Sequence, residues 1–148
     1  MPALAKFLHL AAALFWVGGM GFVLLALRPV VHAQLAPPVR LALMAAVLRR
    51  FFAVVWLGIA LLLLTGMHML VSVGMRSAPL GWHYMLGLGL LMMAVFAHLY
   101  FVPYRRLQRA VAAADWPLAG RHMASIALLV KINFALAWFA IAAVILIK

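Results

Sequence analysis

The sequence predicts an all-α integral membrane protein built as a four-helix bundle. Hydrophobic residues make up 71% of its 148 residues, charged residues only 9%, and the mean hydropathy is +1.23. A soluble domain needs far more polar surface than this to cover its core. The apolar residues fall into four long runs without the period-two alternation of barrel strands, so helices are the expected spanning elements.

Each of the four runs is long enough to cross about 30 Å of hydrocarbon at about 1.5 Å of helix per residue. The predicted spans cover residues 4–27, 51–73, 81–102 and 124–147. The first run includes small residues and Lys6, as a signal peptide does, but its length and Trp16 favour a retained span. We expect a single domain over residues 1–148.

The connections between the runs carry turn and helix signals. Pro37 and Pro38 break the chain before residues 39–48, which read as a short helix running into the second span. The segment VGMRSAPLGW, residues 73–82, is short and turn-rich and predicts an antiparallel hairpin. After the third span, YRRLQRAV indicates a charged helical extension, and Asp115-Trp116-Pro117 indicates a turn.

The net charge of +11 is distributed as a topology signal. Two connections hold eight arginines: Arg28, Arg40, Arg49, Arg50, Arg105, Arg106, Arg109 and Arg121. The other side has only Lys6, Arg76 and Lys148. The positive-inside rule therefore predicts a multi-pass protein of the bacterial inner membrane with both termini on the outer, periplasmic side. The expected partner is the lipid bilayer, and no nucleic acid is expected.

Three histidines from three predicted spans share one depth near the outer face. His9 and His68 each lie about five residues, or about 7 Å, inside the outer end of their spans, and His83 lies in the first outer turn of the third span. Ionisable groups in a bilayer are costly and usually face the bundle interior, so this layer predicts a ligand-binding or redox role. His98 lies near the inner end of the third span, where no other span has a histidine.

The segment GMHM, residues 66–69, resembles a copper clamp but cannot act as one by itself. Successive helix residues are turned by about 100°, so Met67, His68 and Met69 fan across more than half of the helix circumference. We expect His68 to point inward, and Met67 and Met69 to be core or lipid-facing residues.

Two centres suit imidazoles on facing helices, and both remain open on the residues alone. A b-type haem would take His9 with His68 or His83 as axial ligands, Arg76 near its propionates, Trp16 beside its slot and His98 at a second site. Copper(I) would take two or three soft donors from a set comprising His9, His68, His83, Met85 and Met75. The chain has no cysteine, so thiolate sites are excluded.

Three segments also resemble a known family: HLAAALFWVGGMGFVLLALRPVV, LRRFFAVVWLGIALLLLTG and GLGLLMMAVFAHLYFVPYRRLQRAVAAADWPLAGR. Together they resemble the CopD family of bacterial inner-membrane proteins over nearly the whole chain. The plan is also similar to HemJ-type protoporphyrinogen oxidases, which are four-helix proteins that bind haem b. His9 and His98 match histidines of both groups, whereas Met85 and Leu86 stand where the HemJ pattern has its lysine.

The resemblance to HemJ implies haem-dependent redox chemistry, and the resemblance to CopD implies copper uptake or resistance. Our first expectation is a b-type haem protein for electron transfer or membrane-linked oxidation, with a quinone or another redox protein as partner. Whether the protein is a haem-dependent oxidoreductase and whether it forms homo-oligomers stay open. The alternatives are a copper-binding transport or resistance protein using the same layer, and a non-catalytic membrane partner subunit.

Overall fold

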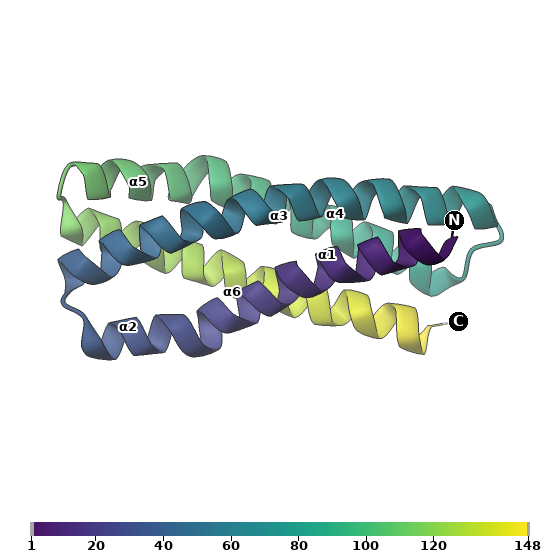
Figure 1. Cartoon of the computed structure of the whole chain (residues 1–148), viewed down its shortest axis with the longest axis horizontal. Helices are drawn as coiled ribbons and strands as arrows, with labels where there is room; N and C mark the ends of the chain where they lie inside the picture. The colour runs from purple at the N-terminus through teal and green to yellow at the C-terminus, as the bar shows by residue number, and fades with distance from the viewer. Residues whose placement is uncertain (1, 148) are drawn as a thin grey trace.

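The computed structural model describes residues 2–147, and every regular element in that range is helical. The chain forms four long rods that run antiparallel (Figure 1). The first rod comprises α1 (Pro2–Phe22), a π-helical turn η1 (Val23–Leu27) and α2 (Arg28–Gln34). The second is α3 (Pro37–Val73), and the fourth is α6 (Trp116–Leu146). The third comprises α4 (Leu80–Leu99), the π-helical turn η2 (Tyr100–Tyr104) and α5 (Arg105–Ala112).

All four rods are long and apolar enough to cross a membrane, which confirms the predicted fold class. They extend beyond the predicted spans, however, chiefly at the arginine-rich end. The 37 residues of α3 make a rod of about 55 Å, whereas the hydrocarbon is only about 30 Å thick. Hydropathy marks the part of each helix that suits lipid, while the backbone hydrogen bonds continue past it. The helix expected over residues 39–48 is therefore the first part of α3 itself.

Local signals end and restart the rods where the sequence predicts. Pro37 and Pro38 open α3. The first N–H groups of a helix have no partner within the helix, so proline, which lacks an N–H, costs no hydrogen bond at these positions. Gly74, with φ of +89°, ends α3 in a conformation that residues with a Cβ rarely adopt. Asp115 caps α6, because its Oδ1 accepts a hydrogen bond from the backbone N–H of Leu118 at 3.1 Å.

The two π-helical turns both accompany a proline within the rod. Pro103 lies inside η2, and Pro29 is the second residue of α2, the helix that follows η1. Proline has no N–H to donate to the α-helical ladder, so the hydrogen-bond pattern shifts locally without breaking the rod.

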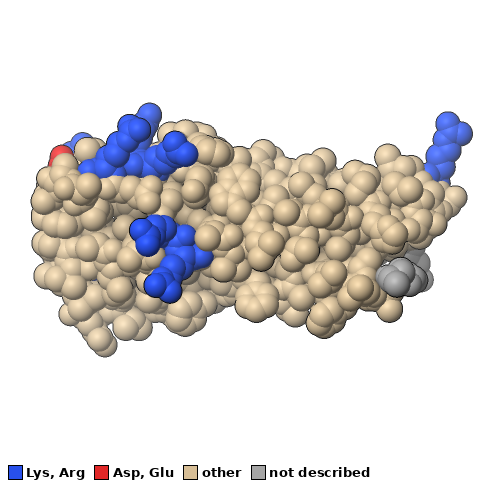
Figure 2. All heavy atoms as spheres, turned by 45° about the horizontal axis from the view of Figure 1, so that its top comes forward, with Lys and Arg blue, Asp and Glu red and all other residues tan. Residues whose placement is uncertain are grey.

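The two ends of the bundle differ in charge. We call the end with both chain termini and the α3–α4 loop the terminal end, and the end with the α2–α3 and α5–α6 connections the basic end (Figure 1). Figure 2 shows Lys and Arg side chains gathered over the half that belongs to the basic end. The charge asymmetry expected from the sequence is thus present in three dimensions.

The rods pack as two pairs, α1 with α3 and α4 with α6, whereas α3 and α4 touch little although a short loop joins them. In the basic half the space between the pairs is filled by an aromatic cluster. Its rings pack edge-on or tilted, with centroids 4.9 to 6.3 Å apart. The cluster consists of Trp16, Phe52, Trp56, Phe96, Tyr100 and Tyr104.

Candidate functional site: a methionine-lined cavity

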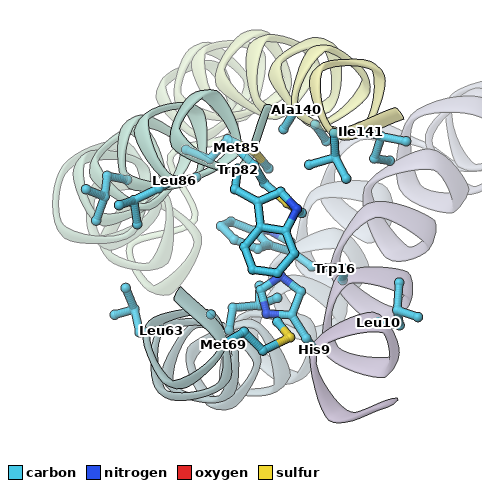
Figure 3. Close-up of a pocket in the computed structure, with 18 of the residues that line it drawn as sticks. His9, Leu10, Trp16, Leu63, Met69, Trp82, Met85, Leu86, Ala140 and Ile141 are labelled. Atoms are coloured by element: carbon cyan, nitrogen blue, oxygen red, sulfur yellow. The ribbon is translucent and has the colours of Figure 1, made fainter. Parts of the chain in front are cut away.

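The terminal half of the bundle contains a cavity of about 330 Å³ where the basic half has its aromatic cluster. Residues of α1, α3, α4 and α6 all line it, so it lies between the two helix pairs (Figure 3). Most of these side chains are aliphatic. Three kinds of residue give the cavity chemical character: one histidine, five methionines and two tryptophans.

The histidine is His9 of α1, whose imidazole is fixed against α3. Its Nδ1 lies 2.9 Å from Oγ1 of Thr65, a buried residue in a span. Gly66 makes room for the ring, because a Cβ at that position would lie only 3.2 Å from Cε1 of His9. The imidazole therefore packs directly on the backbone of α3, with one nitrogen hydrogen-bonded and Nε2 left for other contacts.

Of the nine methionines within residues 2–147, five line the same cavity. Met92 is buried, Met69, Met85 and Met93 are half-buried, and Met67 is 46% exposed. Figure 3 shows Met69 and Met85 projecting into the space that His9 also faces, from α3 and α4 respectively. Thioether sulfur is a soft, uncharged donor, so the walls offer soft donors around one imidazole.

Two tryptophans bound the cavity along the bundle axis. Trp16 is 4% exposed and packs edge-on against Phe96 at 6.0 Å, so it closes the cavity toward the aromatic cluster. Trp82, near the start of α4, lies across the middle of the cavity in the view of Figure 3. Among residues 2–147, Lys6 is the one charged residue of the lining; it is exposed, so its ammonium can extend to water while its stem covers apolar surface.

The structure brings together some of the predicted site residues and separates others. His9, Trp16 and Met85 line the cavity. Four others do not line it and are exposed: His68, Arg76, His83 and His98. His83 instead lies against the α3–α4 loop, with Nε2 3.0 Å from the carbonyl oxygen of Met75 and Nδ1 3.3 Å from that of Pro79. The cavity that His9 lines is thus lined by neither His68 nor His83, its expected partners. As ligands, all of these residues stay predictions.

The rotation of α3 explains the difference at residues 66–69. Gly66, Met67 and Met69 line the cavity, and His68 points away from it. The expectation that His68 points inward is therefore wrong. Equal depth follows from position along a span, but the direction of a side chain depends on which face packs against neighbouring helices. Within residues 2–147, no three His, Asp or Glu side chains come close enough to hold a metal ion.

Two features of the site were not recognised in the sequence, namely Thr65 and the cavity-lining role of Met67 and Met69. Thr65 is the only threonine of the chain and lies inside an apolar span, which was a usable signal. Polar residues in a span usually face a partner on another helix.

Comparison with known families now adds to this geometry. The family model described as copper resistance protein D, CopD, matches residues 45–147, about 70% of the chain. The chain belongs to the CopD family. No curated protein and no solved structure showed significant similarity to it.

The CopD match covers most of α3 and all of α4, α5 and α6, but it does not cover α1. His9 and Trp16 therefore lie outside it, although the resemblance seen in the sequence extended over nearly the whole chain. The predicted CopD membership is confirmed, and with the four long apolar helices it identifies a multi-pass membrane protein. The relation to HemJ-type oxidases gains no support from the match.

Proposed function

We propose that this CopD-family protein binds copper(I) in the methionine-lined cavity as part of copper transport or resistance. The observation that carries the proposal is the lining itself: one imidazole, His9, among five thioethers, in a family described by copper resistance. Copper is the cargo of such a protein, held by His9 with sulfur donors such as Met69 and Met85. These two methionines reach the cavity from different helix pairs.

The chemistry of the lining favours copper(I) over divalent metals. Imidazole and thioethers are uncharged ligands, and soft sulfur selects copper(I). Divalent ions in a low-dielectric site need anionic ligands to offset their desolvation, and the cavity lining contains no carboxylate. Asp115, the sole acidic residue of the chain, caps α6 at the opposite, basic end.

The charge asymmetry supports an orientation for this site. Arginines concentrate at the basic end, which the positive-inside rule places on the cytoplasmic side of the inner membrane. We propose that the terminal end, with the cavity, faces the periplasm. The aromatic cluster would then separate the copper site from the cytoplasmic half of the bundle. A cysteine introduced at Ser77 should react with a membrane-impermeant maleimide in intact spheroplasts if this orientation is right.

A competition experiment tests the binding proposal directly. Purified protein in lipid nanodiscs is titrated anaerobically, under reducing conditions, against a chromophoric copper(I) chelator. Wild-type protein should take about one copper(I) ion per chain from the chelator. His9→Ala should weaken copper(I) binding by about 100-fold or more, because losing a residue that only supports a metal ligand already costs about 10- to 100-fold. His68→Ala is the matched control, because His68 is exposed and points away from the cavity. Equal affinities for both variants, or no copper retained by wild type, would refute the proposal.

Haem b, our first expectation, is the less well supported candidate. Two axial imidazoles would have to face one slot, but His9 is the one histidine among the lining residues. The residues of the cavity thus do not fit a bis-histidine haem. The same nanodisc preparation gives the test: a Soret band that shifts on reduction and disappears in His9→Ala would favour haem over copper.

A further inference from the structure

We infer that Thr65 is a positioning residue that holds His9 in one tautomer, with the proton on Nδ1, so that Nε2 remains free as a metal ligand. The ligand role of Nε2 rests on the proposed function, whereas the tautomer does not. The inference follows from where the single proton of the Thr65 hydroxyl goes.

The Thr65 hydroxyl has only one proton to donate, but its Oγ1 has three polar neighbours: the carbonyl oxygen of Leu61, Nδ1 of His9 and, farther away at 3.5 Å, the carbonyl oxygen of Leu62. Oγ1 lies 2.5 Å from the carbonyl oxygen of Leu61, one turn earlier in α3, and 2.9 Å from Nδ1 of His9. A carbonyl oxygen can only accept, and two oxygens at 2.5 Å repel unless a proton lies between them. The hydroxyl proton therefore belongs to the bond with Leu61, a back-bond that threonine commonly forms in helices.

With its proton used, Oγ1 of Thr65 can only accept from His9. Nδ1 must then carry the ring proton, and a neutral imidazole has one acceptor nitrogen left, Nε2. Two hydrogen bonds therefore run in one direction: Nδ1–H of His9 donates to Oγ1 of Thr65, and the Thr65 hydroxyl donates to the carbonyl oxygen of Leu61 in α3. Thr65 is 7% exposed, so water does not readily replace this partner.

Gly66 determines how closely the imidazole ring of His9 approaches α3. A Cβ at Gly66 would lie 3.2 Å from Cε1 and 3.7 Å from Nδ1 of His9, so the edge of the ring carrying the bonded nitrogen rests against α3. Thr65 thus sets which nitrogen is protonated, and Gly66 sets how closely the ring approaches the helix. Both residues belong to α3. Together they leave the unprotonated Nε2 available as a metal ligand in the cavity that His9 lines.

This arrangement has a consequence for binding. Histidine ligands of metals usually donate their other ring N–H to an acceptor that fixes the tautomer and raises ligand basicity. In this bundle that acceptor exists before any metal arrives. Copper(I) then needs neither a tautomer change nor a proton loss from His9 when the ring is neutral.

The tautomer is measured first, on metal-free protein. Two-bond nitrogen–proton NMR spectra of protein with ¹⁵N-labelled histidine, at about pH 8 where imidazole is mostly neutral, distinguish the tautomers. The His9 signal, assigned by its loss in His9→Ala, should show the proton on Nδ1. Thr65→Val, which keeps the side-chain shape but removes the acceptor, should reduce that form, and Thr65→Ser should retain it. A wild-type signal with the proton on Nε2, or one unchanged in Thr65→Val, would overturn the inference.

Copper(I) affinity is measured second, with wild type and the two Thr65 variants. Thr65→Val should lose about 10- to 100-fold in affinity, and Thr65→Ser should stay close to wild type. If wild type binds no copper(I) but the NMR result holds, the proposed function fails and the assignment of the tautomer stands. If copper(I) binds with equal affinity to wild type and Thr65→Val, the positioning role fails while the proposed function survives.

Discussion

The two halves of this bundle solve the same packing problem in opposite ways. Both must fill the space between the α1–α3 pair and the α4–α6 pair. In the basic half, rings such as Phe52, Phe96 and Tyr104 fill it, and each of these three is at most 2% exposed. In the terminal half, the space stays open as a cavity of about 330 Å³. Four equally hydrophobic helices thus build one close-packed half and one hollow half.

The difference lies in the kind of side chain rather than in hydropathy. Planar rings interlock edge to face and leave little room. The small residues Gly89, Ala137 and Ala140 occupy almost none of the space between the helices, so the cavity stays open. Flexible methionines line it without filling it. In a membrane, where lipid is as apolar as the core, packing rather than burial from water holds helices together. The close-packed half should therefore provide most of the stability, and the hollow half should provide the binding site.

The largest expected effect comes from the centre of the aromatic cluster. Phe96→Ala removes a ring that contacts Trp16, Phe52, Trp56 and Tyr100. We expect a loss of about 3–5 kcal/mol in the free energy of unfolding, the range for phenylalanine truncation in a packed core. Denaturation in mixed detergent micelles measures it.

The control for Phe96→Ala is Phe139→Ala, which removes the same ring from a 66% exposed position on α6. It should cost far less, because lipid replaces the lost contacts. Equal losses from the two variants would show that the aromatic cluster has no special weight, and the contrast between the halves would break down.

A smaller effect on stability, but a large one on binding, is expected from filling the cavity. Gly89 lines the cavity, and a Cβ there would meet nothing within 4 Å. Gly89→Leu should raise stability by about 0.5–1 kcal/mol through better helix propensity, while its side chain occupies the cavity. Copper(I) competition should show that most binding is lost.

Gly87→Leu on the same helix makes a matched control for Gly89→Leu. Gly87 is exposed, has equally free space at its Cβ position, and does not line the cavity. The stability gain should be similar, and copper(I) affinity should not change. If both variants bind copper(I) as wild type does, the cavity is not the binding site.

The smallest expected effect lies at the border of the two halves. Asn133 of α6 is 1% exposed and donates from Nδ2 to the carbonyl oxygen of Met92 at 3.1 Å. Its Oδ1 is buried without a partner within residues 2–147. Asn133→Leu loses one interhelical hydrogen bond, worth about 0.6 kcal/mol, and removes the unpaired oxygen. The two changes offset each other, so the same denaturation assay should give a result near wild type. A loss above about 2 kcal/mol would mean that Oδ1 has a partner, such as a bound water.

How far the sequence predicts this molecule differs between fold and site. The four spans, the breaks at Pro37 and Asp115, and the arginine asymmetry follow from hydropathy, proline and charge, which act locally. The length of α3 does not follow from these signals, since its helical hydrogen bonds continue beyond the apolar run. The position of His9 near the terminal end of its rod follows from the sequence, because position along a helix is a count of residues.

Direction around each helix was not predictable, and this decided the site. His68 and Met69 are neighbours at nearly equal depth, yet Met69 lines the cavity and His68 does not. That choice depends on how α3 packs against α1, through contacts such as His9 with Thr65 and Gly66. A periodic apolar pattern on one face would have revealed the rotation, but α3 is hydrophobic on nearly every side of its membrane segment.

The choice of thioethers rather than thiols makes this site sensitive to one kind of chemical damage. A chain without cysteine cannot close the cavity by a disulfide or have it blocked by thiol adducts. Sulfoxidation is different: it turns a pliable apolar side chain into a polar, chiral one and replaces soft sulfur with hard oxygen. Under the proposed function, an oxidant that reaches Met69 or Met85 should weaken copper(I) binding until a sulfoxide reductase restored the sulfur.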